Sequence, residues 1–125
     1  MALVGAAAWL VIGGADAVPA ALPIPGVRDT IAVEVLNTTV VDGLAREATR
    51  RLRRAGLDVV SVGSDRGAAV DSTLILVRRG DLASGERVRL ALGLGQVMMV
   101  PDPRLLLDVS VLLGPDAAGA IRRDP

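Results

Sequence analysis

The stretch from Ile31 to Val62 constrains the fold most, because its apolar residues change period within it. Residues 31–36 are rich in β-branched side chains, which is typical of a strand. After a polar turn at residues 37–39, apolar residues recur with the period of a helix from Val41 to Ala55. Gly56 supplies the conformation that commonly ends a helix, and residues 57–62 are a second strand-like run. The stretch therefore predicts a βαβ unit.

The rest of the chain supplies three further strands and a second helix. A polar, glycine-punctuated loop leads to residues 72–77, which are apolar nearly throughout and thus typical of a central strand. Asp81 is placed to cap a helix over residues 82–92 that Gly93 ends. Further strands are expected at residues 97–100 and 107–113. The order is βαββαββ, an α+β fold with two helices packed on one mixed sheet, preceded by an N-terminal apolar helix.

The chain divides into four parts. Residues 1–17 begin with an uncharged apolar run and predict a signal peptide, cleaved after the A-x-A sequence at 15–17, or a signal anchor. A buried N-terminal helix is the alternative, and the missing basic residues favour a start codon further upstream. Residues 18–30 are a Pro-rich spacer, and residues 31–115 form the domain. Residues 116–125 are expected to be a flexible tail that is too polar to pack.

The residue types that are absent restrict the chemistry. The chain has no His, Cys, Tyr or Phe, all its basic residues are arginines, and its single aromatic residue is Trp9. Thiolate and imidazole metal sites, cysteine nucleophiles and Ser-His-Asp triads are therefore excluded, and so are Schiff bases. Balanced charges, 14 basic and 14 acidic, and the lack of aromatic stacking platforms disfavour nucleic-acid binding. We predict a non-catalytic protein without cofactor or metal, with a carboxylate/Arg-based enzyme as the less favoured alternative.

Four arginines on the polar side of the first predicted helix are the main candidate ligand-binding residues. They are Arg46, Arg50, Arg53 and Arg54, which recur at helical spacing on the side opposite the apolar residues. Such a row suits an anionic polymer, lipid head groups or an acidic protein partner. The alternative is an ordinary solvated helix face, on which Glu47 pairs with Arg51 one turn later.

A second candidate is Asn37, which lies between the first strand and the first helix. Backbone N–H groups at such a position can hold an anion. The alternative is an Asx-type turn, in which the Asn37 side chain bonds its own backbone. Asp65 and Asp71 share one loop, but two carboxylates are weak evidence for a cation site, and solvated acids are the expected state.

Seven segments carry a resemblance to a known family: Val33–Asn37, Gly43–Ala45, Leu52–Val60, Thr73–Val77, Gly80–Asp81, Leu90–Gly93 and Asp108–Gly114. In their order and spacing they resemble the C-terminal domain of LytR-type cell-envelope proteins. The resemblance implies a domain that follows a phosphotransferase domain, or stands alone behind one membrane anchor in actinobacteria, and faces the cell wall. No phosphotransferase domain is present here, so transfer of glycopolymer is not implied.

The resemblance implies a stand-alone envelope module that is exported and tethered to the membrane by residues 1–17, with the domain on the extracytoplasmic side. It would bind cell-wall polymer or envelope-assembly proteins. Secretion after cleavage near Ala17, and a protein-interaction role through an exposed strand edge, are the alternatives. One departure concerns the first turn, where the family commonly has Asn-Gly-Thr and this chain has Asn37-Thr38-Thr39. If that turn needs a positive φ, the strain falls on Thr38.

Overall fold

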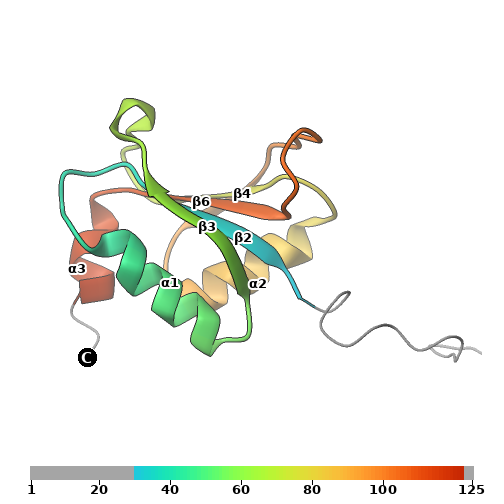
Figure 1. Cartoon of the computed structure of the whole chain (residues 1–125), viewed down its shortest axis with the longest axis horizontal. Coiled ribbons are helices and arrows are strands. Elements are labelled where there is room, and N and C mark those ends of the chain that lie inside the picture. Colours follow the sequence, from blue (N-terminus) through green and yellow to red (C-terminus); the bar gives the residue numbers. More distant parts are fainter. Residues whose placement is uncertain (1–29, 123–125) are drawn as a thin grey trace, which may run out of the picture.

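The computed structural model describes residues 30–122, which form a five-stranded sheet with three α-helices (Figure 1). The predicted signal peptide or anchor, the N-terminal apolar helix and nearly all of the spacer lie outside these residues. No helix within residues 30–122 is long and apolar enough to cross a bilayer. The strands are β2 (Ala32–Asn37), β3 (Asp58–Ser64), β4 (Leu74–Val77), β5 (Gln96–Met99) and β6 (Val109–Leu113); the helices are α1 (Leu44–Arg54), α2 (Leu82–Leu92) and α3 (Asp116–Arg122), with a 3-10 turn η1 (Arg66–Ala68).

The sheet is mixed and has the strand order β3-β2-β6-β4-β5. β2 runs parallel to both β3 and β6, whereas β4 runs parallel to β5 and antiparallel to β6. Each βαβ unit, β2-α1-β3 and β4-α2-β5, thus contributes one pair of parallel strands, and β6 joins the two pairs at the centre. The predicted order βαββαββ and the α+β class are confirmed, and β4 is an interior strand as predicted.

All three helices cover the same face of the sheet, and the core lies between this helix layer and the strands (Figure 1). Alternate residues of each interior strand point into the core, which is why Val33 and Val35 of β2 are fully buried. Among residues 30–122 no α-helix covers the opposite face, and we call it the helix-free face. Its two ends are bordered by the η1 loop and by the loop between β5 and β6 (Figure 1).

The two predicted helices, α1 and α2, have nearly the expected bounds, and only the first residue of α1 differs clearly. α2 spans the expected Leu82–Leu92, because the Asp81 side chain accepts a hydrogen bond from the Ala83 N–H at 3.1 Å and Gly93 takes a left-handed conformation. α1 begins at Leu44, three residues after the expected Val41. The reason is Gly43, whose φ of +88° turns the chain immediately before the helix.

The segment after β6 corrects the expectation of a loose tail from residue 116. Residues 116–122 form α3, and its side chains Ala117 and Ile121, four residues apart, are buried in the core. The Asp116 carboxylate accepts hydrogen bonds from the backbone N–H and the hydroxyl of Thr73, at 2.9 and 2.8 Å. Two apolar residues on one helix face and one carboxylate are therefore sufficient to dock this segment, although its composition is polar.

Gly85 explains how closely α2 approaches the sheet. A methyl group at this position would lie 2.6 Å from side-chain atoms of both Val77 and Val97. Because glycine has no side chain, the backbone of α2 packs directly on the side chains of β4 and β5 at this point.

Candidate functional site

The predicted arginine row lies on the exposed side of α1. Leu44, Ala48 and Leu52 of this helix are buried against the sheet, so the arginines of the polar side face solvent. At 100° and 1.5 Å per residue, the row covers an arc of about 100° and a length of about 12 Å. Its members are Arg46, Arg50, Arg53 and Arg54, and all four are exposed.

The four arginines differ in their hydrogen-bond and ion-pair partners within the protein. Arg50 forms an ion pair with Glu47 at 2.5 Å, in the i,i+3 arrangement. Arg53 donates a hydrogen bond to the carbonyl oxygen of Val59 on β3, at 3.0 Å. Arg46 and Arg54 make no hydrogen bond or ion pair with any other residue in the range 30–122. Arg46, Arg50 and Arg54 are thus the guanidinium groups of the row that do not contact another secondary-structure element.

Arg51, which the sequence placed outside the row, has a structural role. Its guanidinium donates a hydrogen bond to the carbonyl of Leu92, the last residue of α2, at 2.7 Å. It donates another to the carbonyl of Ala120 in α3, at 3.5 Å. A cation at the C-terminal end of a helix is favourable because the carbonyl groups there have no partner within the helix. Arg51 therefore links α1 to both other helices. The expected partner of Glu47 was Arg51, whereas Glu47 bonds Arg50.

Charge is unevenly distributed between the two helices of the βαβ units. α1 contains five arginines and one glutamate, a net charge of +4, in a chain whose formal net charge is zero. α2 contains two arginines and one glutamate, and its Glu86 forms an ion pair with Arg89. This pairing lowers the pKa of Glu86, because the Arg89 side chain donates a hydrogen bond to the carboxylate. The basic surface is thus concentrated on α1.

Asn37 lies away from the row and is buried. Its side-chain oxygen accepts hydrogen bonds from the Thr39 N–H at 2.9 Å and the Thr39 hydroxyl at 2.7 Å, and its amide donates to the Val41 carbonyl at 2.8 Å. This is the Asx-type turn that the sequence offered as an alternative. The neighbouring Thr38 is also buried, and its hydroxyl donates to the Leu113 carbonyl at 2.8 Å. Anion binding by Asn37 remains a prediction.

The helix-free face carries a polar network that sequence reasoning missed. Ser110 of β6 is fully buried, donates a hydrogen bond to the Glu34 carboxylate of β2 at 2.5 Å and accepts one from the Arg78 Nε at 3.0 Å. Arg78 also donates to the Val100 carbonyl at 3.1 Å. The available signal was one polar residue between apolar ones in β2 and one in β6, Glu34 and Ser110, but it is interpretable only when the strand register is known.

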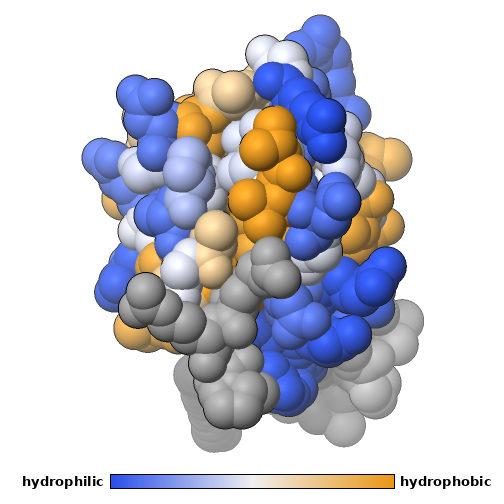
Figure 2. All heavy atoms as spheres, turned by 90° about the vertical axis from the view of Figure 1, so that its left-hand side faces the viewer, coloured by the Kyte–Doolittle hydropathy of each residue, from blue (hydrophilic) through white to orange (hydrophobic). Residues whose placement is uncertain are grey.

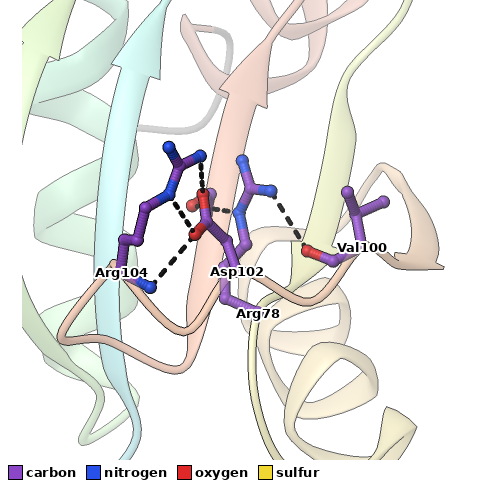
Figure 3. Close-up of polar contacts among 5 residues, drawn as sticks. Arg78, Val100, Asp102 and Arg104 are labelled. Carbon is purple, nitrogen blue, oxygen red and sulfur yellow. Dashed lines mark hydrogen bonds and ion pairs between the residues drawn. The ribbon is translucent and has the colours of Figure 1, made fainter.

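The loop after β5 lies beside this network, where the Asp102 N–H donates a hydrogen bond to the Arg78 carbonyl at 3.0 Å, and Asp102 and Arg104 bond one another within the loop (Figure 3). The Arg104 side chain donates to the Asp102 carboxylate, with Nε at 3.1 Å, and so does the Arg104 backbone N–H at 3.1 Å. These hydrogen bonds, together with the charges of Arg104 and Arg78, lower the pKa of Asp102. Since each charged group here already has a protein partner, we assign a structural role to this cluster.

One hollow of the surface is open and lies at one end of the sheet. It has a volume of about 320 Å³, lies beside the η1 loop and is lined by residues 69–72 and Leu74. Asp71 belongs to this lining, but no group of three or more acidic residues within 30–122 is placed to hold a metal ion. At the end of the domain that carries the β2–α1 connection and α3, apolar side chains form a narrow strip between hydrophilic ones (Figure 2).

Fold and surface together define a small α+β domain whose candidate site is a charged helix face instead of an enclosed pocket. The chain belongs to the family described as LytR cell envelope-related transcriptional attenuator, whose model it matches over residues 30–116. The family predicted from the sequence is thereby confirmed, and membership implies a non-catalytic module associated with the cell envelope.

Two other comparisons add context. The solution structure of the C-terminal domain of RV0431 is 23% identical to this chain in sequence. It matches with a TM-score of 0.49, over 87% of this chain and 92% of the other. None of the curated proteins compared with the chain is similar to it in sequence.

Proposed function

We propose that the chain is an extracytoplasmic envelope module that binds anionic cell-wall polymer through the exposed arginines of α1. The observation that carries this proposal is the net charge of +4 on one helix of a chain with no net charge overall. A local basic surface attracts phosphate and carboxylate groups even when the whole molecule is neutral. Membership of an envelope-associated family supports a ligand of the cell wall.

The chemistry of the row fits a polymer with repeated anionic groups. Guanidinium groups bind phosphate and carboxylate through paired N–H donors, so each arginine can contact one anionic group. A row about 12 Å long presents several such contacts along one line. Three of them, Arg46, Arg50 and Arg54, have no contact with another element, whereas Arg53 is bonded to the Val59 carbonyl of β3.

Binding to isolated wall sacculi tests this proposal. The full chain is compared with a triple variant, Arg46→Gln, Arg50→Gln and Arg54→Gln, at low and at high salt. Removing three exposed charge contacts should weaken binding roughly tenfold or more, and salt should weaken binding of the unchanged chain. A matched control, Arg66→Gln, Arg87→Gln and Arg104→Gln, makes the same change in net charge outside α1 and should bind nearly as well as the unchanged chain.

A comparison of two wall preparations shows whether the arginines bind phosphate or carboxylate groups. Sacculi stripped of phosphodiester-linked polymer should bind the unchanged chain less if phosphate is the ligand group, and equally if the carboxylates of the peptidoglycan are. Equal binding by the triple variant and the unchanged chain at low salt would show that the arginines of α1 are not the site. An envelope-assembly protein would then be the partner to pursue.

The proposed location has its own test. We propose that residues 1–17 hold the protein in the membrane with the domain outside, and the alternative is secretion after cleavage near Ala17. The mass of the mature protein distinguishes retention of the N-terminal segment from its removal. Protease added to intact cells should digest the domain, and protection from protease until the cells are lysed would contradict an extracytoplasmic location.

A further inference from the structure

The two outer strands of the sheet, β3 and β5, are protected to different degrees. An outer strand has unpaired backbone groups, and proteins usually protect them with bulges, charges or short length. β3 has a register shift opposite Val33 and Glu34, and Arg53 occupies the carbonyl of Val59 at its outer side. Charged Asp58 and Asp65 flank its exposed valines. These features make β3 a poor template for a further strand.

β5 lacks the same protection. Its register with β4 is regular, and residues 94–101 contain no charged side chain. Met98 and Met99 are 40% and 45% exposed, and they point to opposite faces of the sheet. Methionine adapts to different packing partners and is common at binding surfaces. Its short length and Pro101 just beyond it are the protective features that β5 retains.

The backbone pattern identifies the groups available for pairing. The N–H groups of Gln96 and Val100 donate to β4, to the carbonyls of Thr73 and Val77, at 3.1 and 3.0 Å. Because the hydrogen-bonding direction alternates along a strand, Val97 and Met99 direct their N–H and C=O groups outward. This pattern is complementary to itself in an antiparallel arrangement. The outward N–H and C=O groups of Val97 can bond those of Met99 in an identical strand, and those of Met99 can bond those of Val97.

We propose that the outer edge of β5 pairs antiparallel with β5 of a second copy of this chain. The twofold axis then passes between the two Met98 residues, and about four backbone hydrogen bonds join two five-stranded sheets into one. An uncharged strand is compatible with its own copy, whereas a strand with a net charge would repel it. The short length of β5 makes this a weak association.

The helix layer also favours self-pairing at β5 over self-pairing at β3. Twofold strand pairing keeps the helices of both copies on one face, so the helix beside the paired strand approaches its own copy. At β3 this would bring together two copies of α1, each with a net charge of +4. At β5 it brings together two copies of α2, where Glu86 and Arg89 neutralise one another and Leu82 is exposed. Since the net charge of α2 is only +1, like-charge repulsion opposes the first pairing more strongly than the second.

Single cysteines test the register, because the chain has no cysteine of its own. In the proposed pairing Met98 faces Met98 across the axis as a non-hydrogen-bonded pair, in which the Cα atoms lie about 4.5 Å apart and a disulfide can form. Under mild oxidation Met98→Cys in the full chain should form a disulfide-linked dimer. Gln96→Cys alone should not, but it should link to Val100→Cys when the two variants are mixed. Val62→Cys on β3 should remain monomeric.

Sedimentation of variants without added cysteine gives an independent readout. Met99→Pro removes an outward N–H without touching the bonds to β4, so it should abolish the concentration-dependent dimer. Val62→Pro is the matched change on β3 and should leave the dimer intact, with folding of both variants checked by circular dichroism. Cross-linking without positional preference, or dimers that survive Met99→Pro, would overturn the proposal and indicate association elsewhere, such as through residues 1–17. A monomer at every concentration would overturn it as well.

Discussion

The two βαβ units share one topology but expose different chemistry. In the first unit, β2-α1-β3, the helix is strongly basic and the outer strand is bulged and flanked by acidic residues. In the second unit, β4-α2-β5, the helix is nearly neutral, and the outer strand is regular and uncharged. The topology determines which strands are outermost, but the side chains determine what each outer region can bind. We assign the first unit to anionic ligands and the second to association between copies.

The largest expected effect tests whether the two units are one cooperative body. Leu52 in α1 and Leu92 in α2 are both fully buried in the same core. Leu52→Ala and Leu92→Ala should each lower the free energy of unfolding by about 2–5 kcal/mol. Urea unfolding followed by far-ultraviolet circular dichroism measures this loss, since residues 30–122 contain no aromatic residue. A variant with two separate transitions would show that the units unfold independently and would break the comparison.

An intermediate effect tests the closer helix packing of the second unit. Gly85→Ala places a methyl group 2.6 Å from side-chain atoms of Val77 and Val97. The resulting overpacking, about 1–3 kcal/mol, should exceed the gain of about 0.5–1 kcal/mol from replacing glycine in a helix. Adding Val97→Ala removes one of the two clashes, so the double variant should lose less stability than the sum of the single variants.

Gly119 in α3 is the control for this prediction. A methyl group there meets no atom within 4 Å, so Gly119→Ala should stabilise the protein by about 0.5–1 kcal/mol. The same urea titration measures both variants. If Gly85→Ala stabilised the protein as Gly119→Ala is expected to do, close packing of α2 would be the wrong reason for its glycine.

The smallest expected effect concerns acid, and it follows from the lowered pKa of Asp102 after β5. The contribution of this carboxylate is complete above its ordinary pKa near 3.8 and is lost as the pH falls through its lowered value in the folded protein. The loop of residues 100–107 should therefore loosen only in strong acid. Amide exchange at Arg104 measures the change. In Asp102→Asn the loop should be looser at neutral pH and lose this acid dependence, and an unchanged acid response would assign the effect to another group.

Features that depend on residues close together in the sequence were predictable, whereas features that depend on contacts between distant residues were not. The periods of the apolar residues are local, so they identified the strands, both principal helices and the polar side on which Arg46 and Arg50 lie. The central position of β6 is non-local, because its partners on β2 and β4 are selected by pairing among several apolar runs that look alike. The contacts of Ser110 with Glu34 and Arg78 depend on that pairing and could not be derived.

Two other features were missed for a different reason. α3 is held by Ala117, Ile121 and Asp116, too few residues to give a helical period against a polar background. The contact from Arg53 to the Val59 carbonyl requires the end of α1 to lie beside the outer side of β3. The polar composition of residues 116–122 predicted a flexible tail, and helical spacing placed Arg53 on a solvent-exposed face. In both cases a few specific contacts outweighed the average character of the segment.

The central position of β6 has a consequence for how the protein is made. β2 and β4 do not pair with one another, and β6, which joins them, is the last strand in the described range 30–122. Its Ser110 bonds Glu34 across 76 residues of chain. Long-range closure of this kind slows folding. We expect the nascent chain to remain open until its C-terminal part has emerged. A polypeptide that folds late is well suited to being threaded through a translocation channel, as the proposed export requires.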